Sequence, residues 1–525
     1  MAFDYVIVGS GINALVAAAM LGKQGKRVLV LERNDRIGGC IRTEEITAPG
    51  FVHDVMATTF VLFLTSPAYA ALAGDLGKRG LEFAQAKFPT GVLRPDGTHA
   101  IFSMDRKRNV ATFEALAAGD GARYAADMDQ LGANAPFLFS LLGGSLWSWE
   151  MFRIIAREGW RRGLRGLAAF FGEALITARG WLEPRYTSPL FQALFAPWVL
   201  HCGLGPESAY GGQMAKVIAF ALEAAGAPIV KGGSGKLLAA FEALIKDQGG
   251  EIRTRADVVN VLLNDKGAAR GVRLADGAEI LAERGVICSV TPQQLYGRLL
   301  PQSARQPAVA EAVAGYRYGK GNMQIHYALK SPPKWRDAAL GEVALLHLTS
   351  GLDGVSKAAN EAERGMLPAE PTVCVGQPTA LDASRAPPGA AILWLQLPEA
   401  PRFIKGDAAG MIAAPADGRW NDDIREQYAD RVEALLAHHI DGFAQTVIAR
   451  KAYSPADIEA LNINLVGGDP YGGYCGVDQF FLWRPLPGSI NHATHVARLF
   501  HIGASTHPGP GLGGGSGFLL AKALG

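Results

Sequence analysis

The stretch "VIVGSGINALVAAAMLGKQGKRVLVLER", residues 6–33, decides the fold. The apolar run that ends at Val8 is typical of a buried strand, and the apolar residues after the glycines recur at helical spacing. Gly9, Gly11 and Ala14 lie between the two segments in the pattern G-x-G-x-x-A. The spacing therefore predicts a strand, a tight turn and a helix.

The small residues of this turn suit a bound dinucleotide. Gly9 allows the turn itself, Gly11 lets the backbone approach a bound group, and Ala14 still permits close packing of helix on strand. The unpaired N–H groups of the first helical turn, which holds Ile12 and Asn13, favour a pyrophosphate together with the helix dipole. A merely structural glycine-rich turn is the alternative interpretation.

An acidic residue at the expected distance strengthens the prediction of a dinucleotide site. Val28–Leu31 is a second strand-like run, and Glu32 follows it, 21 residues after Gly11. A carboxylate at this position can accept hydrogen bonds from an adenosine ribose, and Arg33 next to it belongs to the same predicted site. Because an acid also repels a 2′-phosphate, FAD or NAD fits better than NADP.

The length and composition of the chain limit the kind of protein that can surround this site. A chain of 525 residues is expected to form two or more domains, and 49% hydrophobic with 19% charged residues suits a globular protein with a large core. The net charge of +2 gives no reason to propose a nucleic acid partner. The five cysteines contain no C-x-x-C pair and no metal-ligand pattern occurs, so we expect no metal.

The chain is also expected to be cytoplasmic. The first predicted strand begins at residue 3, which leaves no room for a leader upstream, and no uncharged apolar run reaches about 18 residues.

The next stretch, "ERNDRIGGCIRTEEITAPGF" (residues 32–51), carries a resemblance to a known family. Gly38 and Gly39 closely follow the ribose acid, and the sequence resembles the FAD-dependent phytoene desaturase and amine oxidase superfamily, in which a G-G motif contacts the cofactor. Cys40 stands where that family usually has arginine, so Arg42 or Arg36 would supply the cation. The "TEE…PGF" stretch is most similar to a phytoene-desaturase-like subgroup.

A second segment, residues 232–292, extends the resemblance. It reads as a helix after a Gly-rich turn, followed by short strands, with Asp276-Gly277 as the turn of a β-hairpin. The resemblance implies that the strand carrying Val258 completes the adenine pocket and that Ser289 also contacts the cofactor. An ordinary αβ unit is the alternative from the residues alone.

The C-terminal stretch, residues 499–524, reads as a strand, a glycine-rich loop and a short helix. Such a loop brings bare N–H groups and a helix start together, which suits an anion or a polarised carbonyl. The resemblance implies contacts to the flavin and its ribityl chain, with His507 shaping the loop rather than transferring protons. The residues so implied are Gly503, His507, Gly513, Gly514 and Gly515.

We therefore expect an α/β protein with a Rossmann-like FAD-binding domain of the glutathione-reductase/amine-oxidase type and an inserted substrate domain of mixed sheet and helices. Residues 1–60, 228–295 and 460–525 would form the discontinuous FAD-binding domain, and residues 61–227 and 296–459 the substrate-binding or cap domain. Strand-like runs at 320–329, 342–349, 371–377 and 391–397 and an amphipathic helix at 421–440 fit the inserted domain.

Residues 147–181 leave two interpretations open. Arg153, Arg157, Arg161 and Arg165 are four residues apart beside an apolar stripe, and Trp147, Trp149 and Trp181 lie nearby, as in a helix at a lipid interface. Peripheral contact with the inner face of a membrane is one interpretation, and a cap-domain helix with solvated arginines is the other. Glycines at 159, 163 and 166 argue against a long stable helix.

No constellation of catalytic side chains is recognisable, so the catalytic residues stay unknown and the cofactor should carry the reaction. His201 and His326 could enter a pocket, but each is more often structural. The resemblance implies a desaturase that forms C=C bonds in a lipophilic substrate by hydride transfer to the flavin, with oxygen or a quinone as electron acceptor. An amine oxidase-type enzyme and a flavin-stabilised binding protein without turnover are the alternatives, and the direction of the redox reaction and the oligomeric state stay open.

Overall fold

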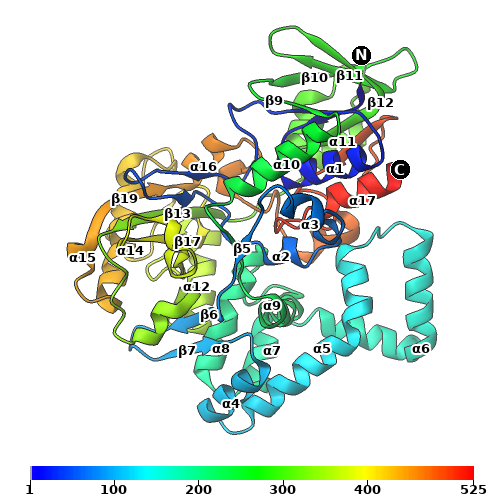
Figure 1. Ribbon diagram of the computed structural model, residues 1–525. Helices are drawn as coiled ribbons and strands as arrows, with labels where there is room; N and C mark the ends of the chain where they lie inside the picture. The colour runs from blue at the N-terminus through cyan, green and yellow to red at the C-terminus, as the bar shows by residue number, and fades with distance from the viewer. Residues whose placement is uncertain (1–2) are drawn as a thin grey trace.

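The computed structural model describes residues 3–525, which build two large sheets with helices around them (Figure 1). The first sheet has the order β10-β11-β12-β1-β2-β9, with β20 beside β12. Strands β20, β12, β1, β2 and β9 are parallel, so their carboxyl ends meet at one edge. The strands are β1 (Phe3–Val8), β2 (Val28–Leu31), β9 (Glu251–Arg253), β10 (Val258–Leu263), β11 (Ala269–Leu274), β12 (Glu279–Ser289) and β20 (Leu499–Ile502).

Both faces of this sheet are buried, as is usual for parallel strands. Ile7 and Val30 pack on one face under helices, whereas Val6 and Leu29 pack on the other against the β10–β11 hairpin. The helices are α1 (Ile12–Lys23), α3 (Pro67–Gly77), α10 (Gly235–Asp247) and α17 (Gly515–Leu524). The strand-turn-helix unit and the hairpin turn at Gly277 are confirmed.

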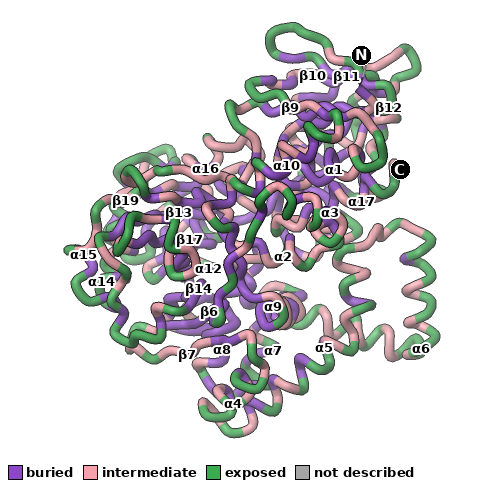
Figure 2. Tube along the Cα trace, in the orientation of Figure 1, coloured by how far each residue is buried: buried purple, intermediate pink, exposed green. Residues whose placement is uncertain are grey.

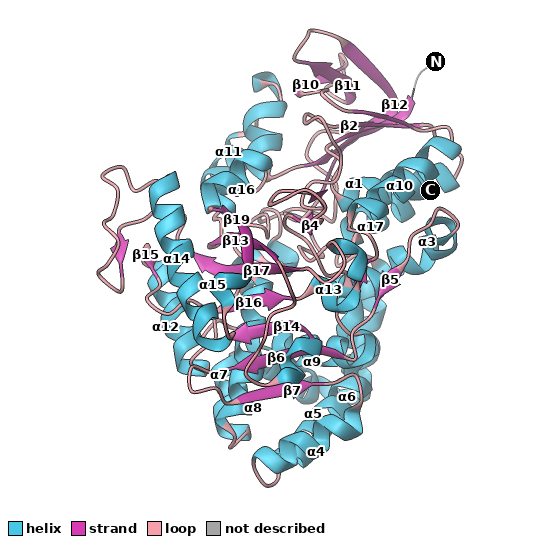
Figure 3. Cartoon of the chain, turned by 60° about the vertical axis from the view of Figure 1, so that its left-hand side comes forward, coloured by secondary structure: helices cyan, strands magenta, loops and turns pink. Residues whose placement is uncertain are grey.

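The second sheet has the order β19-β13-β17-β16-β14-β6-β7, and most of these strands lie side by side in Figure 3. The four predicted strand-like runs and the helix at 421–440 are all present, whereas three further strands of this sheet were not predicted. The strands are β6 (Phe88–Leu93), β7 (His99–Phe102), β13 (Gly321–Leu329), β14 (Val343–Leu348), β16 (Val373–Gly376), β17 (Ala391–Ala400) and β19 (Val447–Tyr453).

The two faces of the second sheet differ in their surroundings. Ile325 and Leu395 belong to an apolar core with α14 (Asp422–His439). The opposite face, which carries Trp394, contacts the short helix η1 (Ala196–Cys202) and leads to α9 (Gly211–Ala225). This opposite face is therefore available to line a cavity.

A helical region completes the chain on the side of β7. Its helices are α4 (Arg106–Leu116), α5 (Asp120–Gly143), α6 (Trp149–Ala174), α7 (Ala178–Arg185) and α8 (Pro189–Phe195). The remaining α-helices are α2 (Val61–Leu64), α11 (Pro307–Ala314), α12 (Leu352–Glu363), α13 (Pro378–Leu381), α15 (Phe443–Thr446) and α16 (Pro455–Leu461). Three small two-stranded sheets pair β3 (Thr43–Glu44) with β4 (His53–Asp54), β5 (Phe83–Ala84) with β8 (Ile229–Val230), and β15 (Met366–Leu367) with β18 (Gly406–Asp407).

The glycines were expected to prevent one long stable helix, and the helix found here is divided at one of them. Residues 149–174 form α6, interrupted only at Gly163, whose positive φ of 71° breaks the helical path. Only Met151 of α6 is buried, and Figure 2 shows the helix as mostly exposed or half-buried. Trp181 was expected at a surface, but it is buried and its indole N–H donates to Asp127. Among residues 3–525 no helix combines the length and apolarity needed to cross a bilayer.

A buried carboxylate joins the two halves of the molecule. Asp54 of β4 accepts hydrogen bonds from Ser234, at the start of α10, and from Thr43, at 2.7 and 2.6 Å. Its second oxygen pairs with Arg385, which lies shortly before β17 and is fully buried. Asp54 therefore connects the helical cover of the first sheet to the edge of the second.

Breaking this pair should destabilise the protein strongly. Asp54→Asn removes the nearer of the two carboxylates that face the buried Arg385 and leaves only Asp382, at 3.5 Å, so we expect a cost of about 3 kcal/mol in the free energy of unfolding. Urea unfolding followed by circular dichroism measures the change. The matched control is Lys246→Met, which breaks an exposed pair with Glu242 and should cost at most about 0.5 kcal/mol. Equal stability of the two variants would contradict the role given to Asp54.

Candidate functional site

A long cavity begins at the carboxyl edge of the first sheet. Gly9 follows β1, Ser289 ends β12 and Gly503 follows β20, and all three line the cavity. They are closely packed, because a Cβ on Gly9 would lie 2.9 Å from the Ser289 carbonyl oxygen. Gly9 also has a φ of +91°, which a side chain would strain. This edge is where open α/β sheets bind ligands.

The start of α1 offers an open cradle. No side chain caps this helix, so its first N–H groups have no side-chain partner. A Cβ on Gly11 would meet nothing within 4 Å, and Gly11, Ile12 and Asn13 all line the cavity. A helix start with free N–H groups and open space before it suits the pyrophosphate of a dinucleotide.

The ribose acid is held in a defined orientation. Glu32 is largely buried at the end of β2 and accepts hydrogen bonds from the Ser10 hydroxyl at 2.6 Å and the Asn34 N–H at 2.9 Å. The Ser10 hydroxyl also accepts a hydrogen bond from the N–H of Gly38, which connects the two glycine motifs. Arg33 and Val258 line the same end of the cavity. The sequence analysis missed Ser10, the variable residue inside G-x-G, because its partner is 22 residues away.

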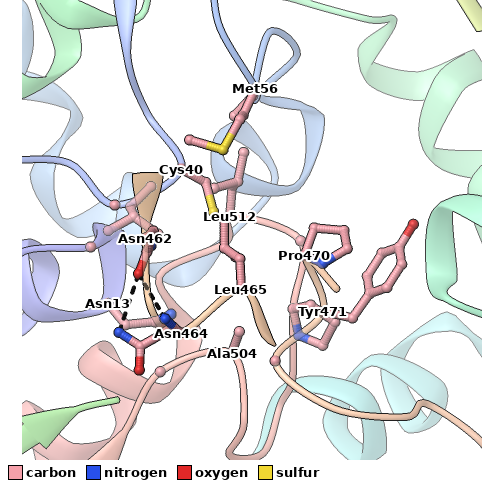
Figure 4. A pocket seen from close by; sticks show the side chains of 18 of the residues that line it. Asn13, Cys40, Met56, Asn462, Asn464, Leu465, Pro470, Tyr471, Ala504 and Leu512 are labelled. Carbon is pink, nitrogen blue, oxygen red and sulfur yellow. Dashed lines mark hydrogen bonds between the residues drawn. The ribbon is translucent and has the colours of Figure 1, made fainter. Parts of the chain in front are cut away.

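The middle of the cavity is formed by loops that meet there. Gly38, Gly39 and Cys40 lie along it, and burial raises the pKa of the Cys40 thiol to about 12, so the thiol is neutral. Figure 4 shows Asn462 and Asn464, joined by a hydrogen bond, on one side and Pro470 and Tyr471 on the other. The sequence analysis named none of residues 462–471 because they carry no recognisable motif.

A buried arginine holds two of these loops together. The Arg484 guanidinium donates to the Ala504 carbonyl at 2.8 Å and to the Tyr471 carbonyl at 2.5 Å. Both acceptor residues line the cavity, whereas Arg484 itself does not. Arg484 is therefore a positioning residue, and no sequence signal marks it, since its contacts join distant segments.

Beyond the loops the cavity becomes apolar. Its walls come from α2, α9, η1 and the free face of the second sheet, with Leu62, Met214, Ile218, Trp198, Leu345 and Trp394 among the lining residues. The charged lining residues are confined to the end near Glu32. They are Glu32, Arg33, Asp257 and Arg298.

Several residues expected at the cofactor lie outside the cavity wall. Ala14 is buried within α1, where it allows close packing. Arg42 pairs with Glu44, as does Arg36, and neither arginine lines the cavity. Gly513, Gly514 and Gly515 form the start of α17 behind the lining residues Gly511 and Leu512.

The histidines serve mainly as buried structural groups. His507 does not line the cavity. Its ring Nε2 is hydrogen-bonded to the Gly144 carbonyl, and burial lowers its pKa to about 4. His326 bonds the Val55 carbonyl in the same way. His201 does line the cavity, and its Nε2 lies 2.9 Å from Nε2 of His347.

The architecture defines a class of protein: a dinucleotide-binding α/β fold whose crevice opens into an apolar chamber under a second sheet, as in flavin-dependent oxidoreductases. The sequence matches the family described as flavin containing amine oxidoreductase over residues 15–362, so the chain belongs to this family. It is an FAD-dependent oxidoreductase, and the glycine cradle and the oriented Glu32 fit FAD.

Individual proteins agree with this assignment along the whole chain. The chain is 27% identical to pyridine nucleotide-disulfide oxidoreductase domain-containing protein 2 of Mus musculus, covering 98% of this chain and 92% of that protein. It is 24% identical to the neurosporene-forming phytoene desaturase of Rhodobacter capsulatus, covering 99% and 93%. The solved structure of putrescine oxidase bound to putrescine shares the fold, with a TM-score of 0.60, 16% identity and coverage of 100% and 99%.

A substitution at Gly11 can test ligand binding without disturbing the fold. Because the space around it is empty and its φ is −64°, Gly11→Val should fold normally, yet the new side chain would occupy the space of the pyrophosphate. We expect FAD affinity to fall at least about tenfold, or 1.4 kcal/mol, in a fluorescence titration with FAD. Gly74→Val on α3, where a Cβ also meets nothing, is the matched control and should bind FAD normally. Unchanged FAD binding by Gly11→Val would contradict the placement of the pyrophosphate.

Proposed function

We propose that this FAD-dependent oxidoreductase is a desaturase that forms C=C bonds in a lipophilic substrate. The observation that carries the proposal is the cavity itself, which runs from the dinucleotide cradle into a chamber whose lining has no charged side chain beyond the Glu32 end. A site for a cation or an anion would be expected to hold a compensating charge, because burying an unpaired charge is costly. The phytoene desaturase among the relatives supports the same substrate class.

The domain boundaries and cofactor contacts are part of this proposal. Residues 1–60, 228–295 and 460–525 would form the FAD-binding domain, which is supported by the strands that they contribute to the first sheet. Residues 61–227 and 296–459 would form the substrate domain. The cofactor contacts proposed from the lining are Gly9, Gly11, Ile12, Asn13, Glu32, Arg33, Gly38, Gly39, Cys40, Val258, Ser289 and Gly503.

The side chains of the chamber align the substrate and exclude water. Bound FAD supplies the hydride acceptor. Trp198, Leu345 and Trp394 give flat or branched apolar surfaces on which a hydrocarbon segment can lie in one orientation. Cys40 and His201 are both neutral, since burial raises the pKa of the thiol to about 12 and lowers the pKa of the imidazole to about 4. Oxygen or a quinone would be the final electron acceptor.

Anaerobic mixing of the yellow protein tests the proposal. A lipophilic polyene or alicyclic hydrocarbon should bleach the flavin absorbance at least about tenfold faster than an aliphatic amine, which corresponds to about 1.4 kcal/mol of activation free energy. Faster bleaching by the amine would favour the amine oxidase alternative. No bleaching by any compound would favour a binding protein without turnover.

The surface of α6 supports peripheral contact with a membrane near this chamber. Trp160 is 93% and Leu164 83% exposed, which is unusual for large apolar side chains. Arg153 and Arg157 are exposed on the same helix. The preceding helix α5 packs against α9 through Leu138 and Val217, and Val217 lines the cavity. An amphipathic basic helix that follows the helix packed on the chamber wall suits uptake of a substrate from an anionic lipid surface.

Vesicle flotation tests the lipid contact. Wild-type protein should float with vesicles that contain phosphatidylglycerol, and Arg153→Gln with Arg157→Gln should lower binding about tenfold or more, since each cation near an anionic surface contributes about 1 kcal/mol. Lys231→Gln with Lys246→Gln removes two exposed charges outside α6 and should have little effect. An equal loss of vesicle binding in both double variants would show that binding depends on net charge and not on α6. If the wild-type protein does not float with the vesicles, α6 is a solvated cap helix.

A further inference from the structure

The cavity face of the second sheet carries a cluster of three carboxamides. Gln324 of β13 lies directly opposite Gln396 of β17 in the antiparallel register, so both side chains point to the same face. Asn322 is two residues before Gln324 and shares that face. All three line the cavity, and we call them the carboxamide cluster. The opposite face of β13 carries Met323 and Ile325 in the apolar core.

This cluster is not satisfied by the protein alone. The Gln396 amide donates to Asn322 Oδ1 at 2.6 Å, but Nδ2 of Asn322 and Oε1 of Gln324 have no hydrogen-bond partner among residues 3–525. Asn322 and Gln324 are 1% and 3% exposed. Exchanging N and O in either amide would change the kind of missing partner, not the fact that one is missing. Buried polar groups are normally paired, so two unpaired ones on a cavity wall call for a ligand.

The missing partner must be uncharged and able both to donate and to accept. One free amide atom is a donor and the other an acceptor, and a hydroxyl group provides both functions. A carboxylate or an ammonium group finds no opposite charge here, because the charged lining residues lie at the Glu32 end. We propose that the carboxamide cluster binds an uncharged hydroxyl or carbonyl oxygen, and that the substrate is a lipophilic alcohol or its carbonyl equivalent rather than a pure hydrocarbon. This inference rests on the proposed function for the statement that the ligand is the substrate.

The polar side chains next to Gln396 across the neighbouring strands, Cys374 and His347, do not call for a ligand. Cys374 lies opposite Gln396, and His347 lies opposite Cys374, so the row ends at the His201–His347 pair. One imidazole donates to the other, which satisfies both Nε2 atoms. These three side chains could also approach a metal ion, but a metal on Nε2 of His347 would force the proton onto Nδ1, which has no acceptor. Within the described chain, Thr58, Trp198 and Thr291 each bring a single unpaired polar atom to the lining, whereas the carboxamide cluster places two on neighbouring side chains of one sheet face.

Binding to the FAD-loaded protein tests the inference with two matched probes, farnesol and farnesene, an isoprenoid alcohol and its hydrocarbon counterpart. Shifts in the flavin absorption spectrum give each dissociation constant. We expect farnesol to bind about tenfold more tightly than farnesene, and Asn322→Leu and Gln324→Met, which keep the side-chain shape, to abolish this preference without loss of FAD. The control Leu345→Met lies on the same wall and should change the affinity for both probes equally.

Several results would overturn the inference: equal affinity of the wild type for both probes, binding of neither, an equal loss of both in the carboxamide variants, or a loss of FAD in those variants. Turnover is scored separately by anaerobic bleaching. If farnesol binds through the carboxamides but no compound bleaches the flavin, the recognition site stands and the proposed desaturase fails. If hydrocarbons bleach the flavin without any preference for alcohols, the desaturase stands and the recognition site fails.

Discussion

The buried ion pair of Asp54 and Arg385 fixes the geometry on which the site depends. The dinucleotide cradle belongs to the first sheet and the chamber wall to the second, so the cavity exists only where the two are held together. Asp54 binds Ser234 on one side and Arg385 on the other, without water to compete for its oxygens. A hydrogen bond also links the two sheets. The Trp394 indole donates to the Met56 carbonyl, which places the cavity face of the second sheet beside the cradle loops.

Local structure could be predicted from the sequence wherever chemistry and periodicity act over a few residues. The short strands predicted after the helix in residues 232–292 are present as β9 to β12, and the turn at Gly277 forms as expected, because such signals are contained in adjacent residues. Strands β6, β7 and β19 were not predicted. The hairpin of β6 and β7 does carry a local signal, the turn at Asp96 and Gly97, which the sequence analysis overlooked. In contrast, β6 also pairs with β14, about 250 residues further along the chain. No local pattern specifies such a partner.

The same distinction explains the site. Glu32 was predicted from its spacing to Gly11, which reflects the length of one βα unit. Ser10 and Arg484 were not, because they act through bonds to segments that the fold brings near. His507 and Arg42 were expected at the cofactor from the motifs around them. Neither residue lines the cavity: His507 is hydrogen-bonded to the Gly144 carbonyl and Arg42 pairs with Glu44, and the motifs around them do not predict these partners.

Helix α6 agrees with the expectation that its glycines prevent one long stable helix. Three glycines cost at most about 1 kcal/mol each, and the helix accommodates them with one break at Gly163. What the helix lacks is a core, since Met151 is its only buried residue. Most helical stability in proteins comes from packing of an apolar face. The proposed lipid contact would supply that packing to an apolar stripe that the protein does not cover, on a helix that also exposes Arg153 and Arg157.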